Sequence, residues 1–123
     1  MRWLLASILL VAVHTPLNAD EQLLRAQVID SDSGRIPQHT YAPKYPEKAR
    51  RDRVEGQVQV CFDIDRRGRP RRIAVRHSTK RAFEKPSIRA VRASSFLPLD
   101  DDQPLQVMKA CRTFIFSLVP RDE

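Results

Sequence analysis

The sequence contains few of the residues from which catalytic and metal-binding sites are built. It has three histidines, two cysteines and three glycines, and no glycine-rich phosphate loop. No second histidine or carboxylate has motif spacing with His77, and the acidic run 100–102 lacks the further ligands of a calcium loop. These absences predict a protein that is not an enzyme and that needs no cofactor or metal.

The one long apolar run lies at the N-terminus, over residues 3–13. It is about half as long as the roughly 20 residues that a membrane-spanning helix needs. Arg2 precedes the run, and Leu17-Asn18-Ala19 ends the segment in the manner of a signal-peptidase site. The pattern predicts a cleaved signal peptide over residues 1–19 and an exported mature protein. An uncleaved inner-membrane anchor is the alternative.

Cysteine is scarce as well. Cys61 and Cys111 are the two cysteines of the chain, and their spacing fits neither a metal site nor a CxxC redox motif. In an exported protein, the expected state of such a pair is a disulfide bond. Two buried free thiols are the alternative, which is more typical of cytosolic proteins.

Acidic residues are outnumbered, at 15 against 22 lysines and arginines, so the formal net charge is +7. In a cytosolic protein such a charge would suggest binding to nucleic acid, but an exported protein does not meet that partner. An anionic envelope surface is the acidic partner that remains. The densest basic patch surrounds a predicted hairpin turn and comprises Arg66, Arg67, Arg69, Arg71 and Arg72. Contact with an anionic surface is one interpretation of this patch, and a solvated turn is the other.

Residues 20–42 are polar and aperiodic, which predicts a flexible lead-in with at most a short helix near 21–26. Residues 43–120 contain both helical and strand patterns and are predicted to form one α+β domain. The predicted elements are a helix over 47–53, strands over 57–64 and 72–78, a helix from 84 or 85 to about 94, and a strand over 105–119.

The two cysteines predict the order of the three strands. Within 57–64 the apolar residues occupy the even positions, and Cys61 lies on the opposite face. Cys111 has the same relation to the apolar positions of the last strand. A disulfide needs Cα atoms within about 7 Å, so the first and third strands should be neighbours. The prediction is a three-stranded antiparallel sheet of order 2-1-3 with a right-handed crossover.

An ordered set of residues in this part of the chain follows the pattern of a known family in both order and spacing. The set consists of Pro43, Tyr45, Pro46, Ala49, Glu55, Gly56, Val58, Val60, Phe62, Ile64, Asp65, Gly68, Val75, Ser78, Phe83, Ala90, Val91, Phe96 and Pro98. The chain thereby resembles the C-terminal domain of TonB over about residues 43–119. The resemblance implies a periplasmic domain with two helices packed on one face of the sheet, an architecture that TolA shares.

In the family that this chain resembles, an extended peptide of an outer-membrane transporter, the TonB box, pairs with the exposed third strand. Main-chain hydrogen bonds give such strand addition its affinity, and pockets for alternate side chains add selectivity. The peptide-binding residues implied by the resemblance are Tyr45, Pro46, Met108, Lys109, Ala110, Arg112, Thr113 and Phe114. The alternative is an ordinary edge strand, on which Lys109 and Arg112 only deter aggregation.

The chain departs from the family pattern at several positions. Ser94 stands where the family usually has a tryptophan, and the lead-in 20–42 is far shorter than the linker of a full energy transducer. The leading hypothesis is a TonB-like module that binds an outer-membrane transporter or another envelope protein, with a role in energy-coupled transport. The alternative is a stand-alone accessory protein that binds cell wall, anionic lipid or a periplasmic protein. A homodimer formed by exchange of the third strand is also left open.

Overall fold

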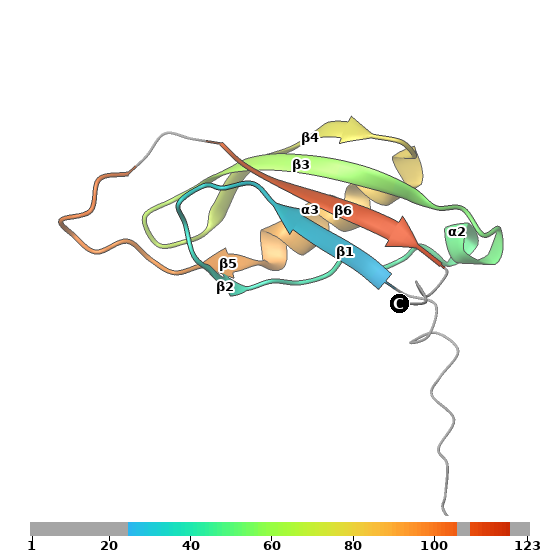
Figure 1. Cartoon of the computed structure of the whole chain (residues 1–123), viewed down its shortest axis with the longest axis horizontal. Coiled ribbons are helices and arrows are strands. Elements are labelled where there is room, and N and C mark those ends of the chain that lie inside the picture. The colour runs from blue at the N-terminus through green and yellow to red at the C-terminus, as the bar shows by residue number, and fades with distance from the viewer. Residues whose placement is uncertain (1–24, 106–108, 119–123) are drawn as a thin grey trace, which may run out of the picture.

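The computed structural model describes residues 25–105 and 109–118. The predicted signal peptide, residues 1–19, and Met108 lie outside the described residues. In chain order the elements are β1 (Arg25–Asp30), β2 (Pro37–His39), α2 (Glu47–Arg51), β3 (Gly56–Ile64), β4 (Pro70–Ser78), the 3-10 helix η1 (Arg81–Phe83), α3 (Glu84–Ala93), β5 (Ser95–Phe96) and β6 (Ala110–Ser117) (Figure 1). Both predicted helices and all three predicted strands are therefore present.

Four strands form the main sheet in the order β1-β6-β3-β4, and every neighbouring pair is antiparallel. β3 lies between β4 and β6, which confirms the order predicted for the three expected strands. The prediction of only three strands is wrong, because β1 adds a fourth beside β6 (Figure 1). The expected flexible lead-in contains, in its described part, β1 and the short β2, which pairs with β5.

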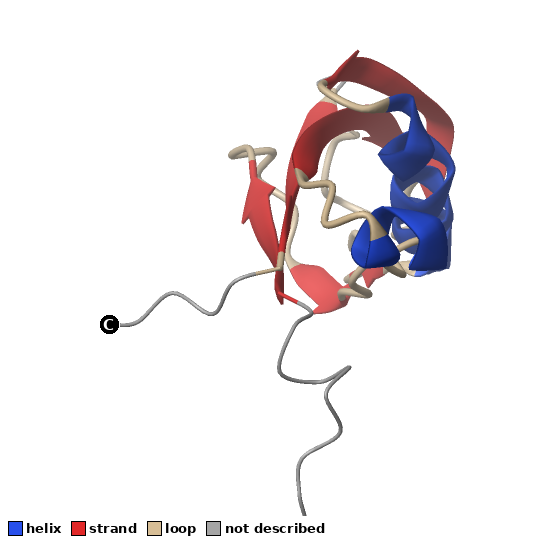
Figure 2. Ribbon diagram, turned by 90° about the vertical axis from the view of Figure 1, so that its right-hand side faces the viewer, coloured by secondary structure: helices blue, strands red, loops and turns tan. Residues whose placement is uncertain are grey.

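Both helices lie on the same side of the main sheet, as the resemblance implies (Figure 2). α3 begins where η1 ends, and Pro86 falls in its first turn, where a missing N–H costs no helical hydrogen bond. Ala90 and Val91 are buried on the inner face of α3, which packs against β3 and β4. Pro46 precedes α2, and its carbonyl accepts the N–H of Arg50 at 2.9 Å. The opposite side of the sheet carries neither α2 nor α3.

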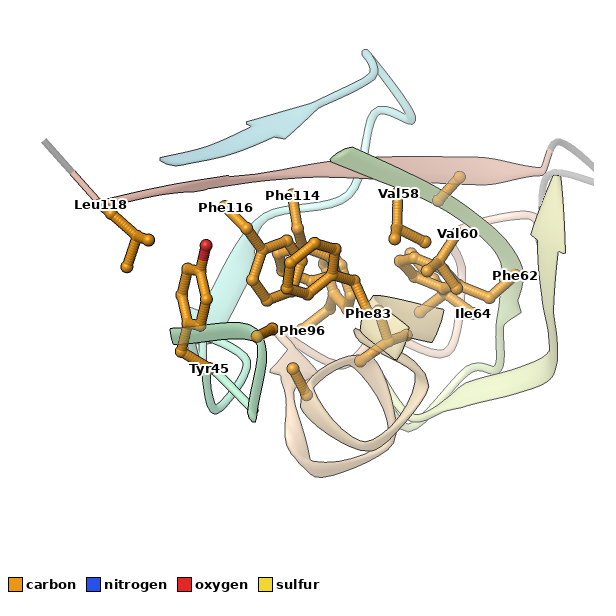
Figure 3. Close-up of a cluster of buried hydrophobic side chains, with 14 residues drawn as sticks. Tyr45, Val58, Val60, Phe62, Ile64, Phe83, Phe96, Phe114, Phe116 and Leu118 are labelled. Atoms are coloured by element: carbon orange, nitrogen blue, oxygen red, sulfur yellow. The ribbon is translucent and has the colours of Figure 1, made fainter. Parts of the chain in front are cut away.

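The core lies between the sheet and the helices (Figure 3). Its centre is aromatic. Phe83 stacks on Phe116 with ring centroids 4.2 Å apart, and Tyr45 meets both rings edge-on. Ser94, at the position of the family's tryptophan, is buried and donates its hydroxyl hydrogen to the carbonyl of Ala90 at 2.7 Å. A small polar residue is thus accommodated there by an internal hydrogen bond.

The β3–β4 hairpin depends on a glycine. Gly68 has a φ of +86°, and a Cβ at this position would lie 1.9 Å from the carbonyl oxygen of Phe96. Glycine alone combines this φ with this close approach at no steric cost. The Phe96 N–H donates to the Gly68 carbonyl at 2.8 Å, so the turn is joined directly to β5.

The predicted disulfide between Cys61 and Cys111 is confirmed. The two residues are cross-strand partners in the β3–β6 pair, with Cα atoms 4.1 Å apart. Their positions in the alternation place the bond on the side of the sheet without helices. For a sequence separation of 50, the chain-entropy model gives a stabilisation of about 4 kcal/mol.

Candidate functional site

The edge of β6 that was expected to be unpaired carries β1. The two strands run antiparallel, with Cα partners over residues 25–30 and 112–117. The pairing continues for one residue: the Ser31 N–H donates to the Cys111 carbonyl at 2.8 Å, and the Cys111 N–H donates to the Ser31 hydroxyl at 2.9 Å. The expectation of an exposed β6 edge is therefore wrong over residues 111–117.

Arg112 is a buried cation on the core side of this strand pair. Its side chain is 1% exposed, at a position in β6 where alternation would place an apolar residue. The guanidinium donates through Nε and Nη2 to the two carboxylate oxygens of Asp30, with 2.9 Å between Nη2 and Oδ2. Its Cζ lies 5.4 Å from the centre of the Phe96 ring. A bidentate pair of this kind adds both energy and directional specificity, so side chains as well as backbone join β1 to β6.

This ion pair makes the environment of Arg112 depend on β1. Removing one partner of a buried ion pair costs about 3–5 kcal/mol, because the remaining charge is left uncompensated. Asp30 is 36% exposed and is partly screened by water, so we expect a value near the lower end, about 3 kcal/mol. Within the described residues, Nη1 of Arg112 is buried and has no hydrogen-bond partner.

The side chains of β1 divide between the two faces of the sheet. Val28 lies opposite Phe114 and packs, half-buried, against the core. Asp30 lies two residues further along on the same face, whereas Ile29 points to the other face and is 49% exposed. Along the β6 edge, β1 therefore presents an apolar residue, then an outward-facing residue, then an acidic residue.

The predicted peptide-binding residues of β6 have different surroundings. Phe114 is fully buried in the core, and Ala110 is buried just before the part that pairs with β1. Thr113 is half-buried on the opposite face. Lys109 is exposed, with its ammonium nitrogen 3.3 Å from the carboxylate of Asp63. Of this set, Arg112, Thr113 and Phe114 have β1 as their neighbour.

Tyr45 lies on the core side of β6, and Pro46 is half-buried directly before α2. The Tyr45 side chain is 5% exposed, its ring packs edge-on against Phe116 at 5.5 Å, and its hydroxyl donates to the carbonyl of Val54. Burial, together with the nearby charge of Glu55, raises the pKa of Tyr45 above its ordinary value. Tyr45 therefore packs against the core-facing side of β6 through Phe116.

The basic turn is organised around Asp65. One carboxylate oxygen accepts the N–H groups of Arg67 and Arg69 at 3.0 and 2.9 Å, and the other accepts Nε of Arg71 at 3.1 Å. Desolvation favours a raised pKa for Asp65, but the hydrogen bonds from Arg69, Arg71 and Arg67 outweigh it and hold the pKa below its ordinary value. The turn is therefore an ordered structure with an ionised carboxylate at its centre.

The five arginines predicted to contact an anionic surface fall into two groups. Three have acceptors within the chain: Arg66 donates to the carbonyl of Asp100, Arg71 pairs with Asp65, and Arg72 pairs with Asp63. The side chains of Arg67 and Arg69 are exposed, and no partner for them occurs in the described part of the chain. These two arginines are the ones available for an external anion.

A cavity of about 400 Å³ lies beside the end of β1. Residues 30–37 form one side of it, and the other lining residues are Phe62, Phe96, Ala110 and Cys111. Arg35 holds this loop by donating to the carbonyls of Ile64, Asp65 and Leu97 at 3.2, 2.9 and 3.3 Å. In residues 25–105 and 109–118, no group of three or more His, Cys, Asp or Glu side chains is placed to hold a metal ion.

Sequence reasoning missed the pairing of Asp30 with Arg112. The available signal was the interruption of the apolar alternation in β6 by Arg112, flanked by Ala110 and Phe114. A charged residue at a core-facing position requires a partner. The partner lies 82 residues away in the sequence, so no local pattern identifies it.

These features define a small disulfide-bonded α+β domain whose sheet has accepted an additional strand on β6. Residues 41–118 match the family described as Gram-negative bacterial TonB protein C-terminal. The chain belongs to this family. Domains of the family are non-catalytic protein-interaction modules of the cell envelope.

A solved structure supports the assignment. The solution NMR structure of the Pseudomonas aeruginosa TonB C-terminal domain is 27% identical, with a TM-score of 0.58, over 75% of this chain and 94% of that chain. No curated protein matches the chain. In the described ranges, no helix has the length and apolar character required to cross a bilayer. β1 precedes the segment that matches the family, so the strand that covers β6 comes from outside that segment.

Proposed function

We propose that this chain is a periplasmic protein-binding module that recognises an extended segment of an outer-membrane transporter by adding it as a strand to β6. The observation that supports the proposal is that β6 already carries one added antiparallel strand, β1, in continuous register over residues 112–117. The same backbone groups can pair with a strand from another protein once β1 leaves. Lys109 and Ala110 extend the contact beyond the part that β1 covers, and the proposed peptide-binding set also includes Met108, which lies outside the described residues.

The proposal includes a role in energy-coupled transport, which requires an attachment to the inner membrane. The mature chain works in the periplasm, an oxidising compartment in which the Cys61–Cys111 bond persists. N-terminal sequencing of the protein from its native envelope tests the attachment. A chain that begins at Asp20 is coupled only through a partner, whereas a chain that retains residues 1–19 carries its own anchor.

Strand addition is tested by titrating the isotope-labelled mature chain with TonB-box peptides from outer-membrane transporters. We expect amide shifts across residues 109–117, because new main-chain hydrogen bonds form along β6. The matched control is the same peptide with proline at its central position, which lacks the N–H needed for pairing. Unchanged β6 amides at millimolar peptide, or equal shifts with the proline peptide, would reject strand addition.

A second candidate function, contact with an anionic envelope surface, is favoured by the exposure of Arg67 and Arg69 at the tip of the hairpin. Binding to anionic vesicles should weaken when the ionic strength rises from about 0.01 to about 0.15 M, because the screening length falls from about 30 to about 8 Å. Arg67→Gln/Arg69→Gln should weaken it further. The control is Arg89→Gln/Arg92→Gln, which removes the same charge from exposed positions on α3. Equal loss in both variants would indicate a general charge effect and reject a site at the turn.

A further inference from the structure

β1 differs from the other strands of the main sheet in how it is attached. It lies outside the family-matched segment 41–118, it is the outermost strand beside β6, and among the described residues it pairs with β6 alone. Among the described residues, its contacts to the rest of the domain include the β6 ladder, the half-buried Val28 and the Asp30–Arg112 ion pair. β1 is thus added to a sheet that is otherwise complete.

Arg112 restricts which strands can take this place. Its guanidinium is buried and faces the core side of the β6 edge, where an uncompensated charge is costly. A strand laid along the edge in the direction of β1 places one side chain opposite Arg112 and another, two residues earlier, opposite Phe114. The first must carry a carboxylate to match the guanidinium, and the second must be apolar to cover the core. Asp30 and Val28 meet both requirements.

We propose that the β6 edge selects an extended segment with an acidic residue opposite Arg112 and an apolar residue two positions before it, and that β1 occupies this site as an internal ligand until such a segment displaces it. The proposal rests on strand addition as the proposed function. It adds which segments β6 selects and how β1 controls their access. A segment without the acidic residue does not displace β1, because its binding would leave Arg112 unpaired.

The tether to the same chain gives β1 an advantage over any free peptide. A strand held by a short linker acts at an effective concentration in the millimolar range. An external segment therefore binds with an apparent dissociation constant that is raised by the inverse of the open fraction. Weakening the Asp30–Arg112 pair increases that fraction and should tighten the binding of a competent segment by the same factor.

The test uses the full mature chain and a synthetic peptide with the sequence of residues 25–31, RAQVIDS, as the probe. The protein variant Asp30→Asn opens the site, and Asp52→Asn at the exposed end of α2 is the matched change of charge. Gln27→Cys/Ile115→Cys joins two cross-strand Cα partners and locks β1 in place. Unchanged β3 and β4 amide shifts verify that each variant keeps its fold.

We expect RAQVIDS to bind the Asp30→Asn chain at least about tenfold more tightly than it binds wild type or Asp52→Asn. The peptide RAQVINS should bind the Asp30→Asn chain about tenfold more weakly than RAQVIDS does. The locked chain should bind neither peptide, whereas the matched Gln27→Ser/Ile115→Ser chain, which forms no second disulfide, should bind RAQVIDS as wild type does.

Equal affinity of RAQVIDS for wild type and Asp30→Asn, or binding to the locked chain, would overturn the inference. A concentration-dependent dimer in which β1 pairs with β6 of a second copy would also overturn occupancy within one chain. TonB-box peptides distinguish the two proposals. If they bind wild type and Asp30→Asn equally and shift the β6 amides of both, the inference fails and strand addition stands. If they bind none while RAQVIDS behaves as expected, the transporter function fails and the internal ligand stands.

Discussion

Replacing Gly68 with alanine should destabilise the domain more than an ordinary turn substitution. An alanine Cβ would lie 1.9 Å from the carbonyl oxygen and 2.7 Å from the carbonyl carbon of Phe96. These are backbone atoms, and no flexible side chain can move aside to relieve the contact. The hairpin turn and β5 must therefore separate.

The expected loss has three parts. A left-handed backbone conformation costs a non-glycine residue about 1–2 kcal/mol. Separation of the turn from β5 breaks the hydrogen bond from Phe96 N–H to Gly68 O, worth about 1 kcal/mol, and loosens the buried Phe96 ring. We expect a total of about 3 kcal/mol, a large fraction of the roughly 5–15 kcal/mol by which a domain is stable. With a urea m-value of about 1.5 kcal/mol/M, the unfolding midpoint should fall by about 2 M.

Urea unfolding followed by circular dichroism, with the disulfide intact, measures this loss. Gly34→Ala is the matched control, because Gly34 also has a positive φ, +70°, but is exposed. It should lose only the conformational part, about 1 kcal/mol. If Gly68→Ala loses no more than Gly34→Ala, the close approach of the turn to β5 does not contribute to stability and this reasoning is wrong.

Three further perturbations give separate tests. Replacing Cys61 and Cys111 together with alanine should lower the unfolding free energy by about 4 kcal/mol, seen as a lower urea midpoint; an unchanged midpoint would contradict the chain-entropy argument. The depressed pKa of Asp65 contributes stability that is fully present above its unfolded pKa, about 3.9, and is lost as the pH falls through the folded value. Asp65→Asn should therefore unfold with a weaker pH dependence than wild type below about pH 4, and equal slopes would argue against the network. Tyr45→Phe removes the hydroxyl that donates to the Val54 carbonyl and should lower the unfolding free energy by about 1–2 kcal/mol, seen as a lower melting temperature; an unchanged melting temperature would contradict a net contribution from this hydrogen bond.

The part of the fold that follows from local pattern was predictable. The apolar even positions from Val58 to Ile64 indicate a strand with one buried face, and the glycine after Asp65-Arg66-Arg67 indicates the turn. Cys61 and Cys111 each lie on the face opposite the apolar residues of their strand, which indicates that these two strands are neighbours. Each of these inferences uses residues whose preference for a strand or turn conformation is local and does not depend on contacts with distant parts of the chain.

The fourth strand was not predictable by the same means. β1 has the sequence RAQVID, in which Val28 and Ile29 are adjacent and no sustained alternation stands out. Its strand conformation comes from pairing with β6 and from the ion pair to Arg112, which are contacts across most of the chain length. To predict the site correctly, Arg112 would have to be treated as a core residue that requires an acidic partner, and not as a surface charge that deters aggregation at an exposed edge.

The disulfide also determines how the domain would respond to mechanical load. A strand added to β6 transmits any pull to β6 first, and β6 is held to β3 by hydrogen bonds that could open one after another. The sulfur–sulfur link between Cys61 and Cys111 joins these two strands covalently at one end of β6, so tension passes into the centre of the sheet without unzipping that end. A pulled partner should therefore detach from β6 before β6 detaches from the domain.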